Sequence, residues 1–306
     1  MNTEMKKESS SGLFKKFTAA PFFGSVVIVA VMLIVMTILK PNYLSPNNIL
    51  ILSKVLAVTA AIGFSQMVII ACGGLNLSIG STGALSAVIC GLINGLLIYH
   101  AGGVGVAFFL TTLATTSVYQ GLMMTITQGN PFYGPGGKYP KAFLAVGNTK
   151  ILGLPTSLWI VIVIAVILAY FFSKMPLGRR ILAFGANNKA AELYGVSKFE
   201  VVLVANIIAG LLASVAGLLA MIRIEAAQPG MGSDWMLMSF AAPLIGGTRN
   251  EGGKVSLLGA VLGAFALTII TNALVHLRVD VYWNELIYGI IIILAITLDR
   301  IRYIRK

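Results

Sequence analysis

The chain has 306 residues, of which 58% are hydrophobic and only 10% are charged. Soluble domains carry about 25% charged residues, so this composition excludes an ordinary soluble protein. The formal net charge of +12 does not indicate nucleic acid as a partner, because there is no basic folded domain to hold it and because Lys and Arg accumulate in the cytoplasmic loops of membrane proteins. The sequence predicts an all-α, polytopic transmembrane helical bundle.

Apolar segments follow one another along the chain, many of them close to the roughly 20 residues that cross a bilayer. We expect about eight to ten membrane segments in a single domain over residues 21–300. A polar cytoplasmic tail at 1–20 precedes this domain, and a short cytoplasmic tail at 301–306 follows it. The segments lie near 21–39, 49–71, 78–98, 105–127, 152–172, 201–221, 235–246, 255–275 and 284–299.

Basic residues cluster before the first segment, in the polar stretch 174–200 and at the end of the chain. The positive-inside rule places all three regions in the cytoplasm. Five segments then lie between the first two of these regions, the N-terminal cluster and residues 174–200. An odd number of crossings cannot return the chain to the same side of the membrane. We therefore expect either a pair of half-spans near 73–95, in "GGLNLSIGSTGALSAVICGLING", or the loss of a helix near 88–91. Interrupted segments of this kind point to a transport path.

Enzymatic patterns are missing, because neither histidine has a carboxylate partner and no nucleophile is paired with a base. We expect no catalytic residues, no metal site and no cofactor in this chain. The apolar segments instead carry neutral amides and hydroxyls, which suit an uncharged polar solute. Hydrogen bonding between helices is the alternative role for any one of them. The candidates for lining the path are Asn76, Ser78, Asn94, Thr115 and Asn272.

A short polar helix is predicted at 188–194, inside the island "GRRILAFGANNKAAELYGVSKFE". Asn187 or Asn188 can cap its start, and Gly195 is a natural stop. A helix of two turns is not stable alone in water. We expect it to dock into a groove on a cytoplasmic partner, with a resting place on the membrane surface as the alternative. The residues assigned to this coupling loop are Gly185, Asn188, Ala190, Ala191, Glu192, Tyr194 and Gly195.

Several stretches carry a resemblance to a known family. They are "GGLNLSIGS", "GLINGLLI", "FLTTLATTSVYQGL", "PLGRRILAFGANNKAAELYGV", "APLIGGTRNEGGKVSLLGAVLGAF" and "IYGIIIILAITLDR". Together they resemble the membrane permease subunits of bacterial ABC sugar importers, in the ribose, galactose, xylose and autoinducer-2 branch. The resemblance implies an inner-membrane permease that pairs with a second permease copy and takes its solute from an extracytoplasmic binding protein. It also implies cytoplasmic ABC ATPase subunits that hydrolyse ATP and hold the loop matching Gly185–Val196 in a cleft.

Two features depart from the family pattern. The family usually has Asp where this chain has Asn76, and "LSIGSTGALSAVI" runs almost directly into "CGLINGLLI" where another apolar segment is expected. We predict a permease that imports a monosaccharide-like solute by alternating access. A secondary carrier or facilitator and a non-transporting membrane scaffold are the alternatives. The basic residues expected to face a binding protein, or simply solvent, are Lys138, Lys141, Lys150, Arg223 and Arg278.

Overall fold

The computed structural model describes residue 20 and residues 22–85, 87–133, 138–248, 251–280 and 283–304. Over these residues the chain is a bundle of apolar helices with one small antiparallel hairpin of strands, so the predicted all-α membrane fold is confirmed. The elements are α2 (Phe23–Leu39), α3 (Pro46–Ala71), α4 (Ile79–Leu85), α5 (Ala87–His100), α6 (Val106–Thr127), α7 (Lys141–Asn148), β1 (Lys150–Ile151), β2 (Leu154–Pro155), α8 (Thr156–Lys174), α9 (Pro176–Ala186), α10 (Asn188–Leu193), α11 (Lys198–Ile224), α12 (Trp235–Ile245), α13 (Leu257–His276) and α14 (Trp283–Ile304).

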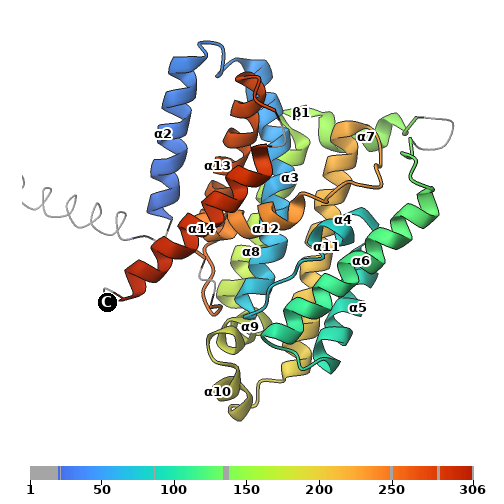
Figure 1. Cartoon of the computed structure of the whole chain (residues 1–306), viewed down its shortest axis with the longest axis vertical. Coiled ribbons are helices and arrows are strands. Elements are labelled where there is room, and N and C mark those ends of the chain that lie inside the picture. Colours follow the sequence, from blue (N-terminus) through green and yellow to red (C-terminus); the bar gives the residue numbers. More distant parts are fainter. Residues whose placement is uncertain are drawn as a thin grey trace, which may run out of the picture.

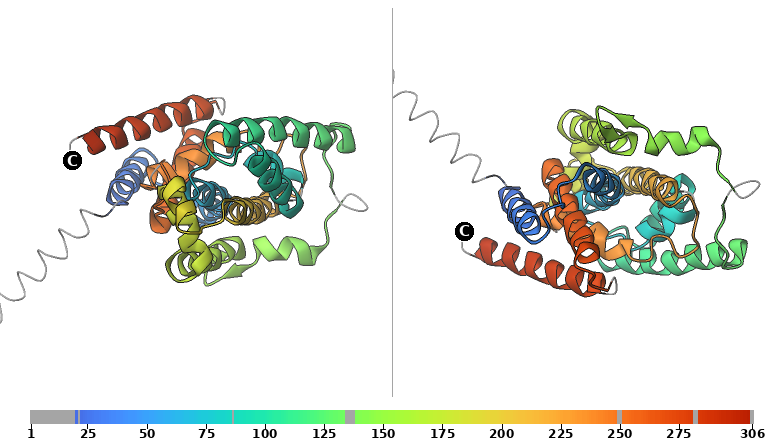
Figure 2. Two further views of the ribbon diagram at one scale, coloured as in Figure 1. Left: turned by 90° about the horizontal axis from the view of Figure 1, so that it is seen from below. Right: turned by 90° about the horizontal axis from the view of Figure 1, so that it is seen from above.

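Five of the helices within the described ranges are long and apolar enough to cross a membrane: α3, α6, α8, α11 and α13. Helix α3 is the central one, since 83% of its most apolar stretch is buried. It packs against α8, α11, α12 and α13, and Figure 2 shows it in the middle of the bundle. Helices α6 and α8 are peripheral, because only 22% of the most apolar stretch of each helix is buried. Their exposed apolar side chains suit contact with lipid.

Small residues allow the backbones around α3 to come close. A Cβ atom added to Gly63 would lie 2.9 Å from the Cβ of Ala242 on α12. Ala57, Ala60 and Ala61 on α3 are at most 1% exposed. The core therefore depends on the absence of large side chains as much as on apolar burial.

The bundle has two recognisable ends (Figure 1). Helices α9 and α10 form one end, which we call the α10 end. Helix α7 and strands β1 and β2 lie at the other, which we call the α7 end. Helix α3 runs toward the α10 end, and α11 runs back from it.

The first discontinuous segment comprises residues 72–100. Beyond α3 the chain is non-helical over residues 74–78, and it then forms α4 and α5. At 1.5 Å per residue, α4 is about 10 Å long and α5 about 21 Å, so neither crosses the roughly 30 Å of hydrocarbon. Two short helices thus lie where half-spans were predicted near 73–95.

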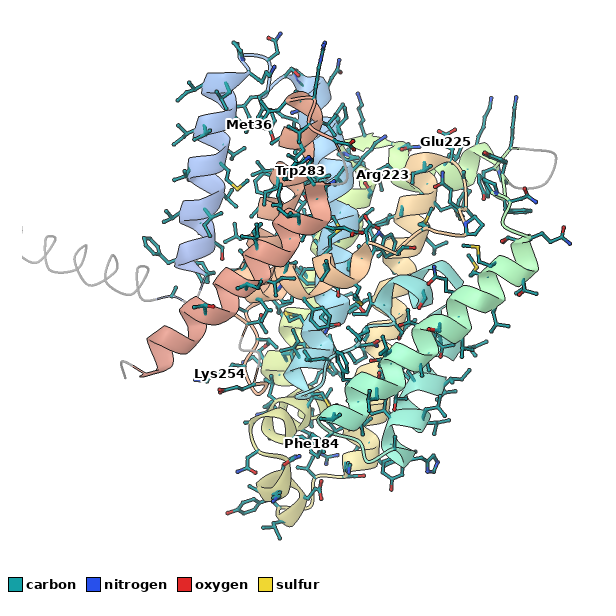
Figure 3. The ribbon with its side chains drawn as sticks, viewed as in Figure 1. Met36, Phe184, Arg223, Glu225, Lys254 and Trp283 are labelled. Atoms are coloured by element: carbon teal, nitrogen blue, oxygen red, sulfur yellow. The ribbon has the colours of Figure 1, made fainter. Side chains whose placement is uncertain are left out.

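The second discontinuous segment comprises residues 225–256. It leaves the α7 end at Glu225 and reaches the α10 end near Lys254 (Figure 3). In the described part of this segment the one helix is α12, which has 11 residues with Pro243 inside and is therefore about 16 Å long. The crossing predicted at 235–246 therefore contains a short helix and not a full-length one. Non-helical chain on both sides of α12 supplies the remaining depth.

Candidate functional site

The two discontinuous segments touch at Gly80 and Gly232. A Cβ atom on Gly80 would overlap the carbonyl oxygen of Gly232, and one on Gly232 would lie 2.6 Å from the carbonyl oxygen of Gly80. Gly232 also has a φ of +91°, a conformation that favours glycine. The close approach joins the first turn of α4 to the non-helical chain that precedes α12.

A chain of hydrogen bonds, the amide chain, joins four buried side chains beside this crossing. Ser78 donates to Asn76 Oδ1 from its hydroxyl at 2.7 Å and from its backbone N–H at 2.8 Å. Asn94 Nδ2 on α5 donates to Ser78 Oγ at 2.7 Å. The Tyr119 hydroxyl on α6 donates to Asn94 Oδ1 at 2.9 Å. Three of the predicted path residues are thus brought together, and Tyr119 is a member that the sequence analysis missed.

Other side chains satisfy the non-helical backbone next to the amide chain. The Gln66 amide, with its nitrogen toward the Asn76 carbonyl, donates to that oxygen at 3.0 Å and accepts from the Asn76 N–H at 3.3 Å. Thr112 Oγ1 on α6 accepts from the Leu77 N–H at 3.2 Å. Irregular backbone at membrane depth requires such partners, because lipid offers none.

A small space beside the amide chain is closed in this structure. Its walls include Ser65, Asn76, Asn94 and Asn206, and it leaves no room for a water-sized molecule. Asn206 Nδ2 donates to the Val202 carbonyl at 2.8 Å, whereas the buried Asn206 Oδ1 has no hydrogen-bond partner. Burying an acceptor without a donor costs about 1–3 kcal/mol. Asn206 Oδ1 is thus an unpaired acceptor on one of the residues that line this space.

The other two path candidates lie apart from the amide chain. Thr115 is buried on α6, where its hydroxyl donates to the Thr112 carbonyl at 3.2 Å. Asn272 on α13 exchanges two side-chain hydrogen bonds with Asn48, at 3.0 and 3.2 Å. Because Asn48 lies in the first turn of α3 and Asn76 lies beyond the last, the full length of α3 separates Asn272 from the amide chain. The Asn48–Asn272 pair fastens α13 to α3.

Helices α9 and α10 form a hairpin at the α10 end, as Figure 1 shows. Asn187 caps α10 by accepting from the Ala190 N–H at 3.0 Å. Gly195, with a φ of +81°, follows the end of α10, as predicted. Arg180 on α9 forms a 3.0 Å ion pair with Glu200 at the start of α11. These contacts fix a short helix that would not be stable alone in water.

The predicted docking face of α10 is split. Ala191 is buried against the core, whereas Tyr194 is 90% exposed. Leu193, which the sequence analysis did not single out, is 88% exposed. Of the other coupling-loop residues, Asn188 and Ala190 are half-buried, Glu192 is exposed, and Gly185 lies in α9 against neighbouring backbone. The outermost apolar surface of this hairpin is therefore Leu193 and Tyr194.

The basic residues expected to face a binding protein are exposed at the α7 end. Lys141 begins α7 and Lys150 lies on β1. Arg223, near the end of α11, has the carboxyl group of Asp234 as an electrostatic neighbour. Lys138 and Arg278 are exposed in the connections at this end.

Comparison with known proteins gives a consistent result. Residues 52–296 match the family described as "Branched-chain amino acid transport system / permease component". The ribose import permease protein RbsC of Bacillus subtilis is 33% identical, with 98% of this chain and 97% of the relative covered. The RbsC of Escherichia coli K12 is 30% identical over 90% of this chain and 92% of its own. The D-allose transport system permease protein AlsC of the same strain is 30% identical over 98% of each. No solved structure matches.

The alignments with two of these relatives are longer than this chain. The match to the Bacillus protein spans 324 aligned positions, and the match to AlsC spans 325. Both exceed the 306 residues of this chain. These relatives therefore contain residues at internal positions where this chain has none.

Proposed function

This chain belongs to the branched-chain amino acid transport system permease family, as a membrane permease of an ABC sugar importer, and on that premise we propose that it imports a monosaccharide-like solute across a bacterial inner membrane. The family is one of transporter permeases rather than enzymes. ATP is then bound and hydrolysed by partner ATPase subunits, and the solute arrives on an extracytoplasmic binding protein.

The amide chain supports a neutral, hydroxyl-rich solute. Relatives are named for the import or transport of ribose, D-allose and L-arabinose, all uncharged sugars. Asn76, Asn94 and Asn206 offer amide groups that exchange hydrogen bonds with hydroxyls at little cost. We propose that opening of the closed space exposes these amides to the sugar, and that closure restores the bonds of the amide chain.

The observation that carries the coupling proposal is the pair Leu193 and Tyr194, which leave 88% and 90% of their surface exposed on a capped, fixed helix. Large apolar side chains projecting together from a polar loop are typical of an interaction site. We propose that they enter a groove of the ATPase, which makes the α10 end cytoplasmic. Both termini are then cytoplasmic, the α7 end receives the binding protein, and a second permease copy completes the transporter.

Reconstitution tests this function. The chain is placed in proteoliposomes with the ATPase and binding protein encoded beside it, and the entry of radiolabelled ribose, D-allose and L-arabinose is measured with and without ATP. We expect uptake of at least one sugar only with ATP and all components. Equal uptake by the chain alone would instead identify a facilitator or secondary carrier. ATPase binding without uptake of any sugar would identify a scaffold.

A matched pair of variants tests the docking site. Leu193→Glu places a charge on the proposed interface and is expected to prevent co-purification of the ATPase. Leu152→Glu is the control, because Leu152 is 86% exposed in the turn between β1 and β2 at the opposite end. Loss of co-purification in both variants, or in neither, contradicts the proposed site.

A further inference from the structure

Four glycines from three distant segments meet at the α10 end. Gly73 follows α3, Gly185 lies in the last turn of α9, and Gly252 and Gly253 lie in the connection between α12 and α13. We call these four residues the glycine junction. It belongs to neither the amide chain nor the exposed surface of α10.

The backbones in the glycine junction touch without side chains between them. A Cβ atom on Gly185 would overlap the Ala71 carbonyl oxygen and would lie 2.9 Å from the Gly253 nitrogen. A Cβ atom on Gly252 would lie 2.8 Å from the Gly185 carbonyl oxygen and 3.0 Å from the Gly73 Cα atom. The Gly253 N–H also donates to the Ala71 carbonyl at 3.3 Å. Backbone groups packed this closely do not slide far past one another before they collide.

The glycine junction connects the exposed helix α10 to both discontinuous segments. Gly185 lies two residues before Asn187, the N-terminal cap of α10. Gly73 immediately precedes the non-helical stretch 74–78, and residues 252–253 lie near the end of the second discontinuous segment. The last turn of α9 is therefore in direct contact with both discontinuous segments and is joined through Asn187 to the exposed helix.

We propose that the glycine junction transmits movement of the α9–α10 hairpin to both discontinuous segments at once, with Gly185 as its central positioning residue. This inference rests on the proposed function, since it describes how an ATPase-driven shift of α10 reaches the amide chain. A shift of the hairpin displaces Ala71 and Gly253 together, because both contact Gly185. The two segments, which cross at Gly80 and Gly232, then move in concert.

The test compares Gly185→Ala with Gly121→Ala. Gly121 is also a helical glycine, but an added Cβ atom there meets nothing within 4 Å. In the reconstituted complex we expect Gly185→Ala to lower the number of sugar molecules transported per ATP hydrolysed roughly tenfold, as a steric conflict at the contact would, while ATPase co-purification stays unchanged. Gly121→Ala should keep the wild-type ratio. Equal ratios in the two variants would overturn the proposal.

A Gly-Gly insertion between Ala186 and Asn187 covers the case in which Gly185→Ala does not fold. It leaves every junction residue in place but loosens the link to α10, so the transport ratio should fall as well. The same insertion after Gly153, in the turn between β1 and β2, is the control. An unchanged ratio in the first insertion would contradict the proposal.

Cys72 provides a readout that does not require uptake. It is 3% exposed beside Gly73, and Cys90→Ser leaves it as the only cysteine. We expect maleimide labelling of Cys72 in the complex to change when the ATPase is trapped with nucleotide, and not to change in the variant with the insertion after Ala186. Absence of sugar uptake by the wild-type complex would refute the proposed function, whereas constant Cys72 labelling would refute the junction.

Discussion

Residues 72–100 and 225–256 are built alike in outline: each follows a long helix, begins as non-helical chain and contains a short helix, α4 or α12. Their interiors differ. In the first segment, side-chain hydrogen bonds from Gln66, Thr112 and Asn94 satisfy the chain. The second is held largely by close backbone packing.

The packing of the second segment depends on small residues. A Cβ atom on Gly263 of α13 would overlap the Ala242 carbonyl oxygen, and one on Gly246 would overlap the backbone of Gly259. Its polar groups are satisfied locally, as when the Thr248 N–H donates to the Pro243 carbonyl at 2.9 Å. The comparison teaches that a membrane protein can stabilise irregular backbone either with side-chain partners or with tight contact. Of the two segments, the first is the one whose polar side chains are assigned to the solute in the proposed function.

The largest effect is expected where the segments cross. Gly80→Val places a branched side chain on the Gly232 carbonyl, and two backbones would have to separate to admit it. We expect destabilisation of roughly 3 kcal/mol or more, measured as loss of folded protein and of thermal stability in detergent. Gly289→Ala on α14 is the control, because nothing lies within 4 Å of an added Cβ atom there. Wild-type stability for Gly80→Val would show that the segments do not cross at this position.

A smaller effect is expected from Gly263→Ala, which probes the second segment alone. Its Cβ atom conflicts with the backbone of Ala242, so α12 and α13 must move apart at a cost of roughly 2 kcal/mol. Thermal unfolding in detergent measures this loss. Gly24→Ala on α2 is the matched control, because the space around Gly24 is open. If the two alanine variants are equally stable, the second segment is not held by close packing.

The smallest stability effect is expected from Asn94→Leu, which has similar volume but removes the centre of the amide chain. Ser78 Oγ loses its donor and Tyr119 loses one acceptor, although Tyr119 retains the Cys90 carbonyl at 3.2 Å. We expect destabilisation of about 1–2 kcal/mol, together with a much larger fractional loss of sugar uptake. Asn272→Leu, which breaks the amide pair with Asn48, should lower stability without this selective loss. Similar uptake per folded molecule in the two variants would show that the amide chain does not contact solute.

Several predictions came directly from local pattern. The capped helix ending before Gly195 follows from the spacing of Asn187 and Gly195. The break near 73–95 follows from Gly, Ser and Asn in an apolar context. The broken helix at 235–246 was not expected because its residues are as apolar as those of a full span, and only Pro243 and the short apolar stretch indicate a break.

Contacts between segments that are distant in the sequence were harder to predict from the sequence. Asn76, Asn94 and Asn272 look alike in the sequence, yet two of them share the amide chain and the third bonds to Asn48 across a different interface. The predicted grouping of Ala191 with Tyr194 fails for a similar reason. Packing against the core turns Ala191 inward and leaves Leu193 and Tyr194 outside.

The sequence by itself determined the membrane class, the family and the short helix between α9 and α11, because apolar length, charge distribution and capping are properties of neighbouring residues. Only the tertiary structure decided that Gly80 meets Gly232 and that Gly73, Gly185 and Gly252 form one junction. A glycine permits close approach without specifying what approaches. The partner is selected when the whole bundle packs, through contacts between residues far apart in the sequence.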